Sequence, residues 1–315
     1  MTLPRPHLAL LGGLFAAIAI SICGGAFNAY HLDVAMTVGI AIILAVSLNL
    51  INGHTGLFSL GHAGFMAIGA YLSSAFSLFV VPHLAGPSPT PAAAQLFFFA
   101  ALLAGGLCAA LAGFVIGLPS LRLKGDYLAL VTLGFGEIVR VIFQNIDSLG
   151  GALGLYGIPP LTNFAWIYGT AAVTIFTVSC LVNSTYGRGF IATHDNEIAA
   201  RSIGLNTTRY KITAFAIGAF FAGVAGGLFA HLRLTLDPRG FDFSRSIEII
   251  LMVILGGMGN TLGVILAAIV LTLLPEVLRP VAEYRMILYS ILLIVLMLLR
   301  PQGLLNLRFS KQSRG

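Results

Sequence analysis

Charged residues are scarce in this chain of 315 residues. Asp, Glu, Lys and Arg together make up 9% of it, whereas hydrophobic residues make up 58% and the mean hydropathy is +0.97. A soluble domain carries roughly 25% charged residues, so this chain lacks the polar surface that a water-soluble protein needs. The composition therefore predicts an all-α polytopic membrane protein.

Sequence motifs for bond-making chemistry are also absent. The chain has no G-x-x-x-x-G-K-[ST] phosphate loop, no H-E-x-x-H metal motif and no C-x-x-C pair. Cys23, Cys108 and Cys180 each lie in an apolar run without metal-ligand spacing, so we expect buried structural thiols. We therefore expect no metal or other cofactor in this chain. Any ATP and Mg²⁺ that its function uses would be bound by another subunit.

One pair of histidines leaves an enzymatic alternative open. His54 and His62 flank Ser59, an arrangement that could indicate an intramembrane hydrolase or a metal site. On an unbroken helix this spacing would separate the two histidines by roughly 12 Å. Histidines near a helix start more often form structural hydrogen bonds, and we favour that interpretation.

Long apolar runs predict eight full transmembrane spans within a single domain that covers residues 1–315. The predicted spans are residues 8–27, 34–51, 65–81, 95–118, 127–145, 164–182, 212–231 and 286–299. Two shorter apolar pieces, 247–255 and 262–274, are separated by glycines and are expected to enter and leave the membrane on one side. The proline-rich residues 82–91 are expected to form an extended loop rather than a helix.

The distribution of basic residues predicts the orientation of these spans. The formal net charge is +6, but basic residues lie at the ends of apolar runs, which argues against nucleic-acid binding. Arg5, segments 122–124 and 188–211 and the tail after Arg300 fall on one side of the alternating spans. By the positive-inside rule, we expect that side and both chain termini to be cytoplasmic. Segment 233–245 is an exception, because alternation places its three arginines outside.

Two glycine-containing breaks, at residues 52–64 and 256–263, interrupt the apolar runs. Irregular backbone at membrane depth is tolerated where it is buried in protein or lines a cavity, and transporters use such breaks to build central sites. The candidates for the translocation path are therefore Asn49, Asn52, Ser59, His62, Glu137, Arg140, Gly256, Gly257 and Asn260.

Two structural alternatives apply to these candidates. The glycines could only allow helices to pack closely, and the pairs with suitable spacing are Gly113/Gly117, Gly223/Gly227 and Gly259/Gly263. Glu137 and Arg140 stand three residues apart within an apolar run, so they can pair on one helix. For these two residues a structural ion pair is favoured over a substrate contact.

The longest polar interruption is the segment 186–211. Its middle predicts a short amphipathic helix that Asp195 or Asn196 caps and Gly204 ends. Glu197 and Arg201 are spaced for an ion pair along that helix. An apolar ridge is formed by Ile198, Ala199 and Ile203. A segment of this kind on the cytoplasmic side favours an element that docks onto a partner.

Several segments resemble a known family. They are LNLINGHTG (48–56), SLGHAGFMAIGAY (59–71), GDYLALVTLGFGEIVR (125–140), DNEIAARSIG (195–204), SIEIILMVILGGMG (246–259) and RPQG (300–303). In this order they resemble the permease subunit of bacterial branched-chain amino-acid ABC importers, the LivM type. The chain departs from the family in having one residue more than usual between the acid and the glycine of segment 195–204. It also has GGALGLYGIP (150–159) in place of a Gly-Gly-Pro-containing stretch.

The resemblance implies a function in transport rather than catalysis. In that family a short cytoplasmic helix rests in a groove of the ATPase subunit. The expected coupling residues here are Arg188, Asp195, Glu197, Ala199, Ala200, Arg201 and Gly204. The implied partners are a paralogous permease, two cytoplasmic ATPases that bind ATP and Mg²⁺, and a periplasmic substrate-binding protein. The protein would lie in the bacterial inner membrane and carry Leu, Ile or Val. Urea or short amides are alternative substrates, and an ion-driven secondary transporter is an alternative class.

Overall fold

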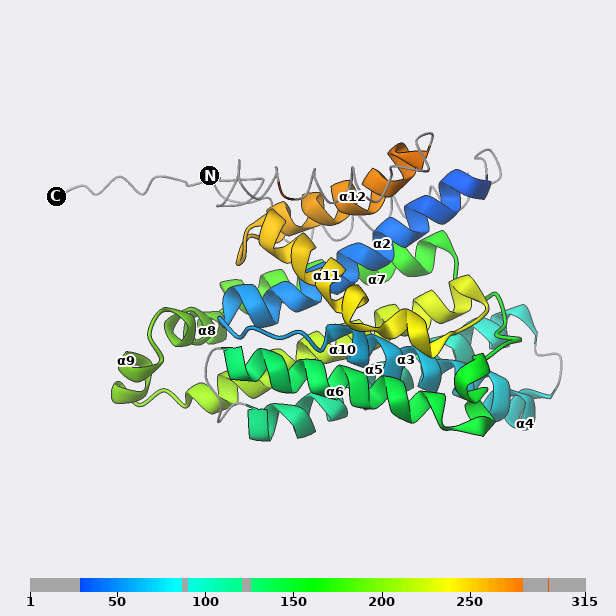
Figure 1. Ribbon diagram of the computed structural model, residues 1–315, viewed down its shortest axis with the longest axis horizontal. Coiled ribbons are helices and arrows are strands. Elements are labelled where there is room, and N and C mark those ends of the chain that lie inside the picture. The colour runs from blue at the N-terminus through cyan, green and yellow to red at the C-terminus, as the bar shows by residue number, and fades with distance from the viewer. Residues whose placement is uncertain (1–28, 87–89, 121–125, 280–293, 295–315) are drawn as a thin grey trace.

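The computed structural model describes residues 29–86, 90–120, 126–279 and 294 (Figure 1). Its α-helices are α2 (Ala29–Asn49), α3 (His62–Ala75), α4 (Val81–Ala85), α5 (Pro91–Ser120), α6 (Asp126–Gln144), α7 (Phe164–Asn183), α8 (Thr185–Asp195), α9 (Glu197–Ser202), α10 (Thr207–Arg233), α11 (Phe243–Gly256) and α12 (Thr261–Val277). Most of them run along the long axis of the molecule. The short helices α8 and α9 lie at one end and α4 lies at the other.

Shorter helical turns join or extend these helices. The π-helical turns η2 (Leu50–His54) and η3 (Phe76–Val80) continue α2 and α3, and the 3₁₀ turns are η4 (Asp147–Leu149), η5 (Gly151–Leu153) and η6 (Pro238–Phe241). An isolated antiparallel bridge joins Leu155 to Leu236. Because irregular segments keep their backbone hydrogen bonds this way, the links between α6 and α7 and between α10 and α11 can pack together.

Six helical segments of the described residues are long and apolar enough to cross a membrane. They are Ala29–His54, His62–Leu84, Pro91–Leu118, Tyr127–Gln144, Phe164–Asn183 and Thr207–Arg233. Each corresponds to one of the predicted spans, which supports a multi-pass α-helical membrane protein. The remaining two predicted spans, 8–27 and 286–299, lie outside the described residues, as do both chain termini.

The division of residues 247–274 into two pieces is confirmed. Helices α11 and α12 run in opposite directions and meet at a turn that lies toward the end of the molecule where α8 and α9 are found (Figure 1). Gly257 and Gly259 in that turn have φ values of +90° and +82°. Such left-handed backbone strongly favours glycine, so the two helices cannot continue into one another.

Two expectations from the sequence were wrong. Residues 82–85 are helical, in α4, because a proline in the first turn of a helix lacks only an N–H that would have no helical partner. Pro91 likewise begins α5. Among the cysteines, Cys108 is exposed and Cys180 partly exposed, because an apolar run does not say which face of its helix turns inward. Cys23 lies outside the described residues.

Glycines bring the central helices α3, α5 and α10 unusually close together. A Cβ on Gly69 of α3 would lie 2.0 Å from the carbonyl oxygen of Gly223 in α10. A Cβ on Gly226 would lie equally close, at 2.0 Å, to the carbonyl oxygen of Met66. Membrane helices associate through this kind of small-residue packing. A Cβ on Gly227 would lie 2.7 Å from Leu102 Cδ2 of α5. The packing role considered for Gly223 and Gly227 is thus present, and both functional regions lie against this scaffold.

Candidate functional site

The first candidate region is the largely buried link between α2 and α3, residues 55–61, together with the turn η2. In place of a helix, this link is held by Asn52, whose side chain is 4% exposed. The Asn52 amide donates to the Ser59 carbonyl oxygen at 3.4 Å, and the Ser59 N–H donates to Asn52 Oδ1 at 3.2 Å. One asparagine thereby replaces the two backbone partners that a helix would have supplied.

Side chains of two other helices accept hydrogen bonds from the end of this link and from the first turn of α3. The Leu60 N–H donates to Thr132 Oγ1 of α6 at 2.9 Å, and the Ala63 N–H donates to Ser246 Oγ of α11 at 3.3 Å. Thr132 and Ser246 are both buried. Irregular backbone inside an apolar protein is stable only with such partners. The irregular backbone between α2 and α3 is therefore stabilised by side chains of α6 and α11.

The two glycine breaks predicted from the sequence meet in space. The Gly259 N–H, in the turn between α11 and α12, donates to Asn49 Oδ1 near the end of α2 at 2.9 Å. A Cβ on Gly53 would lie 2.1 Å from Asn49 Oδ1 and 2.3 Å from the Gly259 nitrogen. Glycine at position 53 is thus required for the approach of the two breaks, which lie about two hundred residues apart in the chain.

The other predicted residues of the second break have structural positions. Gly256 packs so closely on α12 that its Cβ would lie 2.4 Å from Val264 Cα. Asn260 caps α12 by accepting a hydrogen bond from the Gly263 N–H at 3.2 Å. Gly257 provides the positive φ of the turn. These residues fix the shape of the α11–α12 hairpin.

His62 begins α3 inside the bundle. Its Nε2 lies 2.9 Å from Ser47 Oγ of α2, and both side chains are fully buried. The buried atoms His62 Nδ1, Ser59 Oγ and Asn49 Nδ2 have no hydrogen-bond partner among the described residues. The region around the break thus has polar groups with unused hydrogen-bonding capacity in an otherwise apolar bundle.

Glu137 and Arg140 form the predicted ion pair within α6, with Arg140 Nη2 2.7 Å from Glu137 Oε2. Their side chains are 37% and 27% exposed, respectively. Glu137 also lies in a shallow groove between α6 and α11, where Leu60 and Ser246 are neighbours. The pair is therefore structural in its contacts, but its acidic member lies beside the break.

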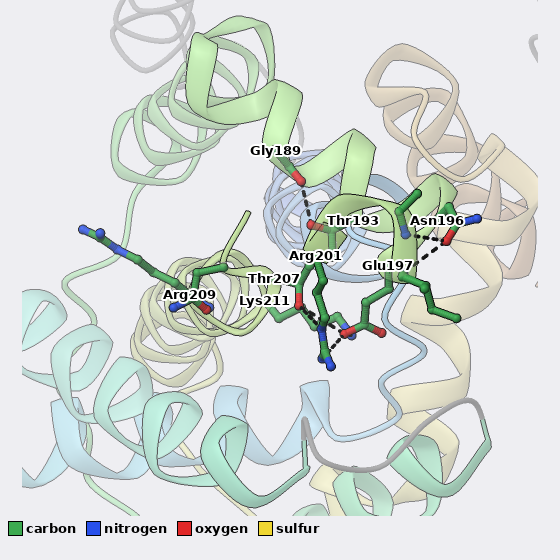
Figure 2. Close-up of polar contacts among 11 residues, drawn as sticks. Gly189, Thr193, Asn196, Glu197, Arg201, Thr207, Arg209 and Lys211 are labelled. Atoms are coloured by element: carbon green, nitrogen blue, oxygen red, sulfur yellow. Dashed lines mark hydrogen bonds and ion pairs between the residues drawn. The ribbon is translucent and has the colours of Figure 1, made fainter. Parts of the chain in front are cut away.

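The second candidate region is the group of helices α8, α9 and the start of α10 (Figure 2). The sequence predicted one short helix here, and the structure adds α8 before it. Asn196, rather than Asp195, caps α9 by accepting from the N–H groups of Ile198 and Ala199 at 3.1 and 3.0 Å. Asp195 is the last residue of α8 and is exposed.

Gly204 ends α9 with the geometry expected of a helix C-terminus. Its φ is +86°, and its N–H donates to the Arg201 carbonyl oxygen at 3.0 Å. The Leu205 N–H then donates to the Ala200 carbonyl oxygen at 3.0 Å. Together these bonds form a Schellman motif, in which glycine is preferred. A Cβ on Gly204 would touch nothing within 4 Å, so the requirement for glycine is conformational.

Glu197 ties α9 to the start of α10. Its Oε1 lies 2.6 Å from Arg201 Nη2 and 2.9 Å from Lys211 Nζ, and it accepts from Thr207 Oγ1 at 3.2 Å (Figure 2). Burial alone would raise the pKa of Glu197, but the hydrogen bond and charge of Lys211, with the charge of Arg201 and the Thr207 hydroxyl, lower it overall. Glu197 is therefore an internal anchor of α9.

The face of α9 away from this anchor is apolar and open. Ile198 and Ile203 are each 76% exposed, and Ala199 is exposed as well. Ala200, in contrast, is buried and turns inward. Arg188 on α8 and Arg201 on α9 are exposed. The predicted coupling residues thus divide into an exposed set around Ile198 and an internal set around Glu197.

Helix α8 links this end of the molecule to the buried break. Aromatic contacts join α8 to α10, with ring centroids of Tyr186 and Tyr210 4.5 Å apart and those of Phe190 and Tyr210 5.8 Å apart. A Cβ on Gly56, whose φ is +67°, would lie 2.6 Å from His194 Cδ2 of α8. The His194 ring therefore lies against the backbone of residues 55–61.

Several residues of these regions were not singled out from the sequence. They are Thr132, His194, Thr207, Lys211 as the partner of Glu197, and Ser246. Spacing rules reach only a few residues along a helix, so contacts between distant segments leave no such pattern. A polar residue within an apolar run was an available signal for Thr132.

Comparison with known proteins places the chain in a family. The profile described as branched-chain amino acid transport system / permease component matches residues 30–299. The chain is 39% identical to the high-affinity branched-chain amino acid transport system permease protein LivM of Escherichia coli strain K12, covering 87% of this chain and 69% of that protein. It is 24% identical to a probable LivM of Methanocaldococcus jannaschii, covering 85% and 90%.

The similarity extends to a second kind of permease. The chain is 23% identical to the LivH permease protein of Salmonella typhimurium, covering 84% of this chain and 90% of that protein. No solved structure matches the chain. With a family profile spanning most of its length and these relatives in agreement, the chain belongs to the family of permease components of branched-chain amino acid transport systems.

Proposed function

We propose that this chain forms half of the membrane pathway of an ATP-driven importer for branched-chain amino acids. The family match over residues 30–299 and the 39% identity to a LivM permease support this proposal. The other half would be a paralogous permease, since the chain is also similar to LivH. A periplasmic protein would deliver the substrate, and two cytoplasmic ATPases would bind ATP and Mg²⁺. The complex would lie in a bacterial inner membrane with the termini of this chain in the cytoplasm.

Helix α9 would dock onto one of the ATPase subunits. The observation that carries this part of the proposal is the 76% exposure of both Ile198 and Ile203, on a helix whose polar side is occupied internally by Glu197. Isolated exposed apolar residues are common on protein surfaces. Ile198 on α9 and Ile203 at its C-cap lie beyond the apolar bundle and form a small ridge suited to a groove in a partner.

Movement of α9 would reach the pathway through α8. The Tyr186–Phe190–Tyr210 cluster packs α8 against α10, so α8, α9 and the start of α10 would move together. The His194 ring lies against Gly56, and a displacement of α8 would therefore press on the link between α2 and α3. Closely packed contacts transmit such shifts because protein interiors have little free space.

Uptake by the reconstituted complex tests this function. The chain would be purified in complex with its binding protein, second permease and ATPases, and inserted into liposomes. We expect ATP-dependent uptake of labelled leucine that unlabelled isoleucine and valine inhibit and that urea and acetamide do not. Inhibition by urea and not by isoleucine would indicate that urea is the substrate. Full uptake by this chain alone, driven by an ion gradient, would contradict an ATP-driven importer.

A further inference from the structure

A cavity with a volume of about 260 Å³ lies between α2, α11 and α12. Its walls include Ala41 and Leu44 of α2, Arg245 and Glu248 of α11, and Thr272 of α12. Sites for small ligands typically measure roughly 300–1,000 Å³. A cavity slightly below that range suits a ligand the size of a single amino acid.

Opposite charges lie at the more open side of this cavity. Arg245 Nη1 lies 2.9 Å from Glu248 Oε2, and the two side chains are 27% and 47% exposed. A guanidinium group has five N–H donors and a carboxylate has two acceptor oxygens. The pair can therefore hold each other and still offer donors to an anion and an acceptor to a cation.

The inner wall of the cavity is apolar. Leu44 is 1% exposed, Ile249 2% and Met252 8%, and all three line the cavity. A branched aliphatic side chain placed against them would remove apolar surface from water, worth roughly 25 cal/mol for each Å². The cavity thus combines a charged side of both signs with a hydrophobic base.

A buried hydroxyl group on one wall has no hydrogen-bond partner in the part of the chain that the structure describes. Thr272 Oγ1 is buried, lines the cavity and has no hydrogen-bond partner among the described residues. Pro275, on the same wall, has no N–H to donate to the Leu271 carbonyl oxygen one turn earlier. Buried polar groups are rarely left unpaired, so Thr272 indicates that a ligand with a polar end belongs in this cavity.

We propose that this cavity binds a free α-amino acid with an apolar side chain. The carboxylate is held by Arg245, the ammonium by Glu248 and the Thr272 hydroxyl, and the side chain by the wall around Leu44 and Ile249. The substrate class rests on the proposed function. The cavity is lined by the first part of α11 and the last turns of α12, whereas the turn that joins these two helices lies toward α8 and α9 (Figure 1). The cavity therefore lies away from α9, on the side from which import would begin.

Binding of labelled leucine to the purified full chain in phosphatidylglycerol nanodiscs tests the site without requiring transport. We expect saturable binding that is competed by isoleucine. 3-Methylbutylamine, which lacks the carboxylate, and 4-methylpentanoate, which lacks the ammonium, should compete weakly. Absence of saturable binding up to about 10 mM leucine would overturn the proposal. Loss of leucine binding when phosphatidylethanolamine replaces half of the lipid would also overturn the proposal, because the zwitterionic lipid headgroup would then be the occupant of the cavity.

Variants assign the binding to this cavity. Glu248→Gln should weaken leucine binding about tenfold, since it removes a charge-assisted contact. Thr272→Val, which keeps the side-chain shape, should weaken it roughly threefold. Thr208→Val, at an exposed position on α10, is the matched control and should bind as the unchanged chain does. Thermal unfolding of each variant confirms that it is folded.

The outcomes separate this proposal from the proposed function. If leucine is taken up by the complete importer but Glu248→Gln and Thr272→Val bind it normally, the cavity proposal fails alone. If the chain binds leucine with the expected losses in both variants but the complete importer does not transport it, the proposed function fails while the site stands.

Discussion

The link between α2 and α3 and the helix α9 are both polar segments in an apolar chain, but they keep their shapes by different means. The link is largely buried, and neutral side chains such as Asn52 and Thr132 bond directly to its backbone. Helix α9 is exposed, and an ion-pair cluster around Glu197 attaches it to α10. Buried neutral hydrogen bonds are insensitive to salt and pH, whereas ion pairs near the surface respond to both. The link is therefore a fixed structural element, whereas the attachment of α9 to α10 depends on salt and pH.

Replacing Asn52 should have the largest effect on stability. Asn52→Leu would leave the N–H and carbonyl of Ser59 buried without the partners they have now. Each buried polar group that loses its partner costs about 1–3 kcal/mol, so we expect a loss of roughly 2–6 kcal/mol. The measurement is thermal unfolding of the purified chain in detergent. Asn163→Leu, which removes an exposed helix cap of α7, is the control and should cost about 1 kcal/mol. Equal effects of the two would remove the distinction between the buried link and the surface.

Gly53→Ala should separate the two breaks. The added methyl group would lie 2.1 Å from Asn49 Oδ1 and 2.3 Å from the Gly259 nitrogen. Overpacking of this kind costs about 1–3 kcal/mol, and ATP-driven leucine uptake should fall with it. Gly134→Ala is the matched control, because nothing lies within 4 Å of the new methyl group. It should be neutral or slightly stabilising, since alanine favours a helix. If Gly53→Ala is as well tolerated, the close approach of the breaks is not needed.

A smaller effect is expected from acid. The pKa of Glu197 is lowered in the folded chain from its ordinary value of 4.5, so the ionised carboxylate stabilises the attachment of α9. That contribution is present above about pH 4.5 and is lost as the pH falls through the lowered pKa. Hydrogen exchange of α9 measured from pH 7 downward should show loss of protection below pH 4.5. In Glu197→Gln the protection should already be low at pH 7 and change little. A pH dependence unchanged by Glu197→Gln would mean that another group holds α9.

The sequence predicted the helices of this protein well because length and hydropathy dictate membrane spans. The short helix ending at Gly204 was predicted for the same reason that it forms, a cap and a glycine at the right distance. Helix α8 was missed because Gly187 and Gly189 are poor helix formers. At these two positions tertiary packing, rather than helix propensity, determines that the helix forms. A Cβ on Gly189 would lie 2.3 Å from the Tyr210 ring, so glycine allows the contact that stabilises α8.

The candidate site was predicted in its members but not in its connections. The sequence indicates Asn49, Asn52 and Gly256 only as single positions near the breaks, and Glu197 only with its helical neighbour Arg201. The contact of Asn49 with Gly259 and that of Glu197 with Lys211 join segments that no local rule relates. The packing of α3, α6 and α11 determines which polar side chains hydrogen-bond to backbone groups and which have no partner among the described residues. The pattern of the sequence alone does not specify it.

The exposed ridge of α9 should contribute to coupling and almost nothing to folding. Substitutions at exposed positions usually change stability by less than about 0.5 kcal/mol. The double variant Ile198→Asp/Ile203→Asp should therefore unfold at the same temperature as the unchanged chain. Leu153→Asp, at a position that is 83% exposed in η5, is the control for an apolar-to-acidic change away from α9.

ATP-driven uptake of leucine by the reconstituted importer containing the Ile198→Asp/Ile203→Asp chain tests the central claim most directly. If α9 docks onto the ATPase through these two side chains, uptake falls at least about tenfold, because two buried apolar contacts are lost. Co-purification of the ATPase should fall with it, while Leu153→Asp transports normally. Uptake and ATPase retention at the level of the unchanged chain would contradict the assignment of α9 as the coupling element.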